Sequence, residues 1–239
     1  MTGRLFCCVA LAGVSLLFGG CASVSSPLVD SAALLFSPDH GAATIPEQPD
    51  PRYSFLRVQV SGYPPGMLAL GFIDEVPGGS EAPVLVWYSA QHEVLRTQDG
   101  RIVANTGTPF DWSALRWIVP PPAWRGVGDA GYRYSRERDV LPDYEFGLRE
   151  VVLGSPIAMP DTDQLPVTLP ATVAQSLRWY KEVPYMERAG GQAGSATLPP
   201  SIFGWGQYAG ESMVVYSEQW LTPEVSIRIQ RWPVTKGAQ

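Results

Sequence analysis

Strand-like alternation is the main pattern of the chain after residue 50. Within Leu56–Val60, apolar side chains alternate with polar ones, which predicts a half-buried strand. Met67–Ile73 and Val84–Tyr88 are almost entirely apolar, and we expect them to be strands covered on both faces. The period of two, repeated over short runs, favours a β protein.

A turn dipeptide and a proline run separate some of the strand-like segments. Asp99-Gly100 stands between strand patterns at Val94–Thr97 and Arg101–Thr106, and this dipeptide is typical of a tight hairpin because the turn needs positive φ. Pro120–Pro122 lacks three backbone donors in a row, so it cannot lie in a central strand. It predicts an extended connector.

The middle of the chain is more varied. Tyr132–Arg138 alternates aromatic with charged residues, which favours an exposed or edge strand, and Tyr144–Leu153 is a further strand candidate. Thr172–Val183 fits either a strand or a short helix. Gly190–Ser195 is expected to be a flexible loop.

The last two strand patterns are clear, at Met213–Trp220 and Val225–Trp232. Together the runs suggest about ten to twelve strands joined mostly by short turns. We therefore expect an all-β fold, an antiparallel meander folded over on itself or barrel-like, with at most one or two short helices. Residues 51–239 form a single domain in this interpretation.

The N-terminus resembles a bacterial lipoprotein signal. Arg4 precedes an apolar run, Leu5–Phe18, that is shorter than the roughly 20 residues needed to cross a bilayer. The run ends in Phe18-Gly19-Gly20-Cys21, which resembles a lipobox, although Phe18 holds the position where leucine is usual. We expect residues 1–20 to be removed as a signal peptide and Cys21 to be lipidated. An uncleaved anchor, or an ordinary signal peptide with a cysteine by chance, is the alternative.

Lipidation of Cys21 would determine where the protein is located in the cell envelope. Two or three acyl chains anchor a protein firmly, because each buried methylene contributes about 0.8 kcal/mol. Ala22 follows the cysteine where aspartate would favour inner-membrane retention, so sorting rules for lipoproteins imply the outer membrane, with the body facing the periplasm. Residues 21–50 are interpreted as a lipidated tether, in which Leu28–Phe36 could form a short helix.

Composition narrows the function further. The formal net charge is −6, which argues against a nucleic-acid partner, and charged residues make up only 17% of the chain. The 24 glycines and 23 prolines suit a turn-rich β protein. The three cysteines are Cys7, Cys8 and Cys21, so the processed chain would keep no free thiol for a disulfide, a metal or nucleophilic attack.

A scatter of short motifs resembles a known family. They are Trp87-Tyr88-Ser89, the run Leu95–Val103 with Thr106-Gly107 and Asp111, Phe203 with Trp205, Tyr216–Pro223, and Ile227-Arg228-Ile229. They are similar to the YjbF family, which includes the lipoprotein of the group 4 capsule system. Thr108-Pro109 departs from the apolar residue that the family tends to have there.

The resemblance implies an all-β fold and a role in producing or exporting capsule or exopolysaccharide, beside polysaccharide export proteins. It brings no catalytic residues, so we expect a non-enzymatic binding or assembly module. Two alternatives stay open: a structural envelope lipoprotein that supports outer-membrane protein assembly, and an enzyme acting on glycan.

Few residues carry candidate chemistry. His40 and His92 are the only histidines, so neither a metal site nor a Ser-His-Asp triad is favoured, and we expect no cofactor. A pair of carboxylates drawn from Asp143, Glu145 and Glu150 could hydrolyse a glycoside, but solvated strand faces are the simpler interpretation.

Exposed aromatic rings could stack on sugars, although rings filling a β core are the simpler interpretation. The candidate contacts with glycan or a partner are Trp124, the ring that we would first expect to be exposed, Trp205, and Gln219, whose amide could instead satisfy a sheet edge.

Overall fold

The computed structural model describes residues 45–75, 82–107, 111–140 and 145–233. Cys21 and the rest of residues 1–44 lie outside this range, so the signal peptide, the lipidation site and nearly all of the tether remain predictions. Within these ranges, three short helical segments occur, η1 Trp124–Gly126, α2 Ala171–Ser176 and η2 Ala189–Gly191. The strands are β1 Phe55–Val60, β2 Gly66–Asp74, β3 Val84–Tyr88, β4 Val94–Gln98, β5 Arg101–Thr106, β6 Trp112–Val119, β7 Tyr132–Val140, β8 Glu145–Ile157, β9 Arg178–Arg188, β10 Gln192–Ala196, β11 Ser201–Tyr208, β12 Glu211–Trp220 and β13 Ser226–Trp232.

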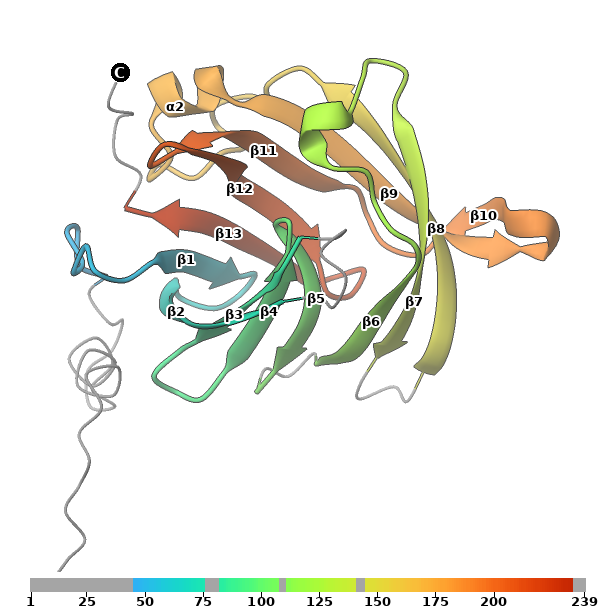
Figure 1. The fold of residues 1–239 in the computed structure, drawn as a ribbon, viewed down its shortest axis with the longest axis horizontal. Coiled ribbons are helices and arrows are strands. Elements are labelled where there is room, and N and C mark those ends of the chain that lie inside the picture. Colours follow the sequence, from blue (N-terminus) through green and yellow to red (C-terminus); the bar gives the residue numbers. More distant parts are fainter. Residues whose placement is uncertain (1–44, 76–81, 108–110, 141–144, 234–239) are drawn as a thin grey trace, which may run out of the picture.

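All described strands belong to one antiparallel sheet, as the sequence predicts. Neighbours in the sheet follow the order of the chain from β1 to β9, then from β11 to β13, and β13 pairs with β1. Because β8 pairs with β9, the sheet curls round into a barrel-like shape (Figure 1). Among the described residues, the fewest registered pairs join β5 to β6, where only Asn105 and Trp112 are in register.

The β10 hairpin stands outside this ring. Strand β9 carries β11 along one part of its edge and β10 along the rest, so β10 prolongs the sheet past the barrel wall. It projects on the side opposite the first described residues (Figure 1). The flexible loop expected at Gly190–Ser195 is therefore partly wrong, because Gln192 and Ala193 pair with the end of β9.

The Asp99-Gly100 hairpin is confirmed. Both residues have positive φ, 48° and 80°, in the turn between β4 and β5. A Cβ on Gly100 would also lie 2.5 Å from the side chain of Val214, so this position needs glycine for space as well as for conformation. Pro120–Pro122 lies outside the strands and connects β6 to η1, as expected of a proline run.

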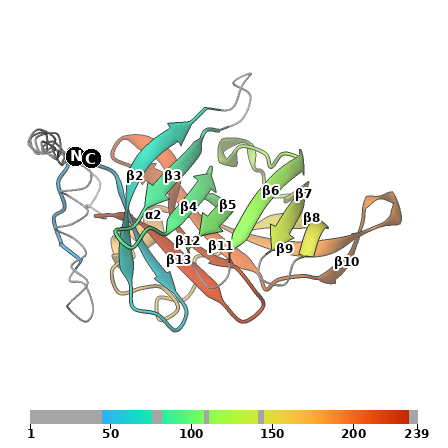
Figure 2. The same ribbon diagram turned by 90° about the horizontal axis from the view of Figure 1, so that it is seen from below.

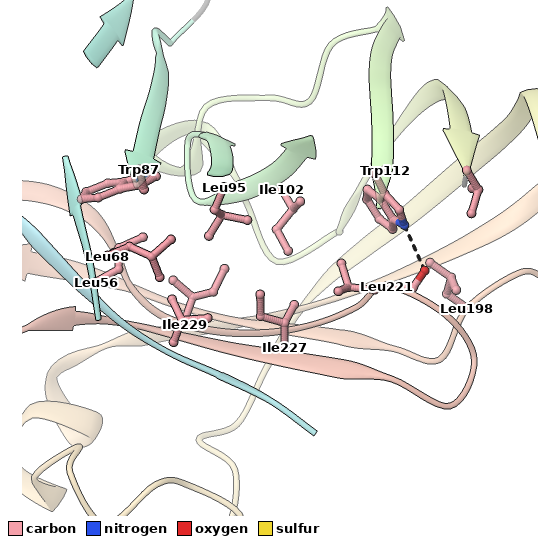
Figure 3. Packing of buried hydrophobic residues seen from close by; sticks show 12 residues of the cluster. Leu56, Leu68, Trp87, Leu95, Ile102, Trp112, Leu198, Leu221, Ile227 and Ile229 are labelled. Atoms are coloured by element: carbon pink, nitrogen blue, oxygen red, sulfur yellow. Dashed lines mark hydrogen bonds between the residues drawn. The ribbon is translucent and has the colours of Figure 1, made fainter. Parts of the chain in front are cut away.

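An aliphatic core fills one part of the barrel. Inward side chains of β1 to β5 meet those of β13, and Figure 3 shows Ile227 and Ile229 facing the side chains from the opposite wall. The Nε1 of Trp112 donates to the carbonyl of Leu221 at 2.9 Å and closes one end of this core (Figure 3). The fully or nearly buried members are Leu56, Val58, Leu68, Trp87, Leu95, Ile102, Trp112, Val140, Leu198, Leu221, Ile227 and Ile229.

A second apolar cluster lies where α2 and its flanking loop meet β9, β11 and β12. Leu169, Ala174 and Leu177 pack there against Trp179 and Tyr216. Seen from below, β10 again extends past the end of the barrel (Figure 2).

The segment Thr172–Val183, for which both a strand and a short helix were expected alternatives, contains one of each. Helix α2 ends at Ser176, and strand β9 begins at Arg178.

One expectation about covered strands is wrong in part. Strand β2 is buried at Met67 and Leu68, but Phe72 and Ile73 are 58% and 48% exposed, and Tyr88 at the end of β3 is 46% exposed. Apolar composition alone cannot show where a strand runs beyond the elements that cover it.

Candidate functional site

Strand β7 carries buried charge into the barrel. It lies between β6 and β8, and Tyr134, Arg136 and Arg138 are only 1%, 8% and 4% exposed. The prediction of an exposed or edge strand at Tyr132–Arg138 is therefore wrong. The alternation is present, but the polar face of β7 points into the barrel. There its side chains bind Glu150 on β8 and Glu182 on β9.

Glu150 on β8 is the first of these partners. It pairs in register with Arg136, whose Nε donates to Oε2 at 2.7 Å, while Nη2 of Arg138 donates to Oε1 at 2.9 Å. The hydroxyl of Thr197 donates to the same Oε1 at 2.6 Å. Glu150 is 0% exposed, so the expectation of a solvated carboxylate is wrong at this position.

Ionisation of Glu150 is fixed by these neighbours. Burial works to raise the pKa of this carboxyl, but the two guanidinium groups and the hydrogen bonds outweigh it and lower the pKa to about 2. Burial likewise works to lower the pKa of Arg136, and Glu150 reverses the effect. The group therefore stays an ion cluster at physiological pH.

A second buried cluster joins β5 to β9. Nε and Nη2 of Arg101 donate to Oε1 of Glu182 at 3.0 and 2.7 Å, and both side chains are almost fully buried. The hydroxyls of Tyr132 and Tyr134 donate to the same carboxylate at 2.7 Å each. Burial and the adjacent carboxylate raise the pKa of both tyrosines, so they remain neutral donors.

Trp124 closes this second cluster. The expectation that it is exposed is wrong, since the residue is 1% exposed and its Nε1 donates to the carbonyl of Asp99 at 2.9 Å. The Arg101 guanidinium lies over the indole ring, 3.9 Å from its centroid, and the ring packs against Tyr180 and Phe203. The proline connector thus carries a tryptophan into the interior, where a buried cation stacks on it.

The other two candidate contacts lie close to Trp124. Trp205 is half-buried against the same aromatic cluster. Gln219 is 6% exposed, accepts from the backbone N–H of Ile102 at 3.0 Å and donates to the carbonyl of Gly100 at 2.9 Å. Gln219 and Trp124 therefore both bind the backbone of the Asp99-Gly100 turn, and the structural interpretation of Gln219 explains its contacts.

The arrangement holds its buried charges in ion pairs. An internal cavity of about 10 Å³, lined in part by Thr97, Ser217 and Arg231, has room for one water molecule. Glu145 is exposed on β8, while Asp143 and His40 lie outside the described residues. Across the described ranges, no group of three potential metal ligands occurs, and His92 sits in an exposed turn with φ of 70°.

The sequence predicted the alternation along β7 but not the burial of its charged side chains. Tyr132, Tyr134, Arg136 and Arg138 occupy one face of a strand, a pattern that continues to the apolar Val140. An apolar residue at the end of an otherwise polar face was the available signal that this face points inward. Glu150 and Glu182 carry no such signal, because their own local sequence does not show which side chains of other strands will lie beside them.

The outer surface retains exposed apolar side chains at several places. Phe72 and Tyr88 lie on β2 and β3, Ile118 and Val119 at the end of β6, and Phe146 on β8 is 66% exposed. Among the described residues, no helix has the length and apolar character needed to traverse a membrane.

Comparison with known proteins bears on the fold. No family model matches the sequence, and no curated protein matches it. Among solved structures, the fold is similar to the crystal structure of the hypothetical lipoprotein YmcC from Escherichia coli (K12), with a TM-score of 0.53 and 14% sequence identity. The match covers 78% of this chain and 86% of that chain. The chain therefore shares its barrel-like all-β fold with a hypothetical lipoprotein.

Proposed function

We propose that this protein is an outer-membrane lipoprotein, anchored through lipid on Cys21 and facing the periplasm, that assists the production or export of a surface polysaccharide. It works as a binding or assembly module and not as an enzyme. The finer parts of this proposal, the polysaccharide role above all, rest on the motif resemblance described from the sequence.

Two features support the anchored module. The run Phe18–Cys21 has the small residues and the cysteine of a lipobox, and the body has a fold similar to that of a hypothetical lipoprotein. The likeness of fold, joined to this signal, is the observation that carries the proposal.

The packing of the barrel favours binding through the outside. Glu150 and Glu182, the buried carboxylates, are engaged by arginine, tyrosine and threonine side chains. Contacts with export proteins or with glycan would then be made by the outer surface and by the projecting β10 hairpin.

A deletion strain tests the role. We expect loss of the gene to lower the surface polysaccharide, wild-type protein to restore it, and the Cys21→Ser variant to fail although it folds. Cell-surface polysaccharide is quantified, and intact-mass spectrometry of the membrane fraction reports the lipid on Cys21. Normal polysaccharide in the deletion strain would contradict the proposal.

Affinity capture separates this proposal from a role in supporting outer-membrane protein assembly. Polysaccharide export proteins in the captured set support the first role. Barrel assembly factors without polysaccharide proteins would overturn it in favour of the second. Release of sugar fragments from purified glycan by the pure protein would instead indicate an enzyme.

A further inference from the structure

An apolar row crosses the outer face of four neighbouring strands. Trp232 on β13 pairs in register with Phe55 on β1, Phe55 with Ala69 on β2, and Ala69 with Tyr88 on β3. The residues next to them in sequence, such as Leu56 and Leu68, belong to the interior core, so the row itself faces outward. We call these four residues, with Phe72, the outer apolar row.

The beginning of the row is covered by the chain's own first described residues. Nε1 of Trp232 donates to the carbonyl of Pro46 at 2.8 Å. The ring of Tyr53 packs edge-on to Phe55 with 6.3 Å between centroids. Phe55 is therefore only 3% exposed although it faces away from the barrel core.

The far end of the row is bare. Tyr88 is 46% exposed and Phe72, which pairs with Val86 on β3, is 58% exposed. The Tyr88 ring lies close against Gly71 of β2, because a Cβ added there would be 2.5 Å from the ring. An exposed aromatic surface thus continues directly from a surface that the N-terminal segment already covers.

We propose that the segment Leu28–Phe36 docks on the Tyr88 and Phe72 end of the outer apolar row. The segment holds five large apolar residues and a single charge, Asp30. Burying those side chains and the two exposed rings together removes apolar surface of both from water.

The reach is sufficient. The nine residues between Phe36 and Pro46 span up to roughly 30 Å when extended. Three strand spacings separate Trp232, where Pro46 is held, from Tyr88, which amounts to about 14 Å. The chain leaves the described part of the structure at the covered end of the row, so the segment lies within reach of its bare end.

Charge favours this occupant over the bilayer itself. Asp74 and Glu75 follow Phe72 and Ile73 at the end of β2, and both are exposed. Their charges, on a chain of net charge −6, oppose approach to an anionic leaflet. They do not oppose an almost uncharged segment of the same chain.

Docking would set the length of the tether, a consequence that rests on the proposed lipidation. From Cys21 to Ile45 the chain extends up to about 80 Å, but from Cys21 to Leu28 only about 25 Å. The docked segment would hold the barrel near the membrane, and its release would let the barrel reach further.

A disulfide scan tests the docking in the full-length protein expressed with its own signal. Leu34→Cys is combined with Tyr88→Cys, and the matched control combines Leu34→Cys with Phe146→Cys, an exposed aromatic position on β8. We expect an intramolecular disulfide in the first pair, seen as a band shift without reductant, and none in the control. The same pair placed on Cys21→Ser gives the same result if docking holds, whether or not Cys21 is lipidated.

Three outcomes overturn the proposal. One is equal cross-linking in both pairs or in neither. Another is a disulfide between two copies through Tyr88→Cys, which would indicate a second copy as occupant. The third is a blue shift of an environment-sensitive dye on Phe72→Cys that requires vesicles of phosphatidylethanolamine and phosphatidylglycerol, which would indicate the bilayer.

A charge substitution gives an independent readout. Phe72→Glu with Tyr88→Glu removes the apolar end of the row at exposed positions, so the barrel keeps its circular dichroism spectrum. We expect protease cleavage between residues 28 and 45 to become about tenfold faster, because the segment loses its docking surface. Phe146→Glu should leave the cleavage rate unchanged, and an unchanged rate in the double variant would contradict docking.

Discussion

The two sides of the barrel interior are held together by different chemistry. The side built from β1 to β5 and β13 is aliphatic, with Ile227 and Ile229 packed against leucines and Trp87. The side built from β7 to β9 holds arginines and glutamates that are as buried as the aliphatic residues. The same period of two therefore produces a core in one place and an ion network in the other.

The difference decides how each side responds to change. An aliphatic side chain needs only close packing, so its loss removes contacts and leaves a cavity. A buried ion needs its partner, because an uncompensated charge in the interior is far more costly than a gap. The ionic side should therefore be the more sensitive one, and the following predictions test this from the largest effect to the smallest.

Glu150→Ala should have the largest effect on stability. It leaves Arg136 and Arg138 buried without their carboxylate, and breaking such a group destabilises by about 3–5 kcal/mol. The free energy of unfolding is measured by urea denaturation. A loss of less than about 1 kcal/mol would show that water or a rearranged side chain compensates for the missing charge.

Acid should weaken the wild-type protein through the same residue. The pKa of Glu150 is about 2 when folded, against an ordinary value of 4.5. A carboxyl whose pKa is lowered by folding stabilises above its unfolded pKa, and this stability is lost as the pH falls from about 4.5 towards 2. We expect wild type to lose about 3 kcal/mol more than Glu150→Gln over this range. Parallel losses in the two proteins would contradict the assignment.

Gln219→Ala should cost an intermediate amount. It removes the partner of the Ile102 N–H and of the Gly100 carbonyl at the β4–β5 hairpin. Leaving buried backbone groups unsatisfied costs about 1–3 kcal/mol. The urea midpoint measures the change, and Gln219→Glu serves as a comparison because it keeps the acceptor for Ile102 but loses the donor to Gly100.

Ile227→Val should cost less, about 1 kcal/mol, because it removes one methylene from the aliphatic core. The denaturant midpoint should move while its slope stays constant. A loss as large as that of Glu150→Ala would remove the proposed contrast between the two sides of the barrel.

Glu137→Gln should have the smallest effect. Glu137 lies on β7 next to Arg136 in sequence, but faces outward and pairs with Arg116 and Arg149, which are 55% and 64% exposed at their side chains. Exposed ion pairs contribute little because water screens them. The urea midpoint should not change measurably, which makes this variant the matched control for Glu150→Gln on a neighbouring strand.

Much of the fold could be predicted from the sequence. The period of two gave the strands, and Asp99-Gly100 fixed a hairpin because few residues adopt its positive φ. The runs at β12 and β13 were predicted nearly to the residue, because turn residues bound them on both sides.

The buried polar interior could not be predicted in the same way. Whether the polar face of β7 points inward depends on Glu150, only twelve residues from Arg138, but also on Thr197, which is remote in sequence. Trp124 is buried because it stacks on Arg101, a contact between a connector and a strand that no local pattern records. Exposure of aromatic candidates is therefore the property that sequence reasoning predicted least well.

Hydrogen exchange in acid tests the contrast between the two sides most directly. Backbone amide protection is followed by mass spectrometry at about pH 6 and pH 3, corrected for the intrinsic pH dependence of exchange, in wild type and in Glu137→Gln. The contrast predicts that β7, β8 and β9 lose protection first, because Glu150 takes up a proton at pH 3 once its strand opens, while β1, β12 and β13 keep theirs. Equal loss of protection on both sides, or earlier loss in β1 and β13, would contradict it.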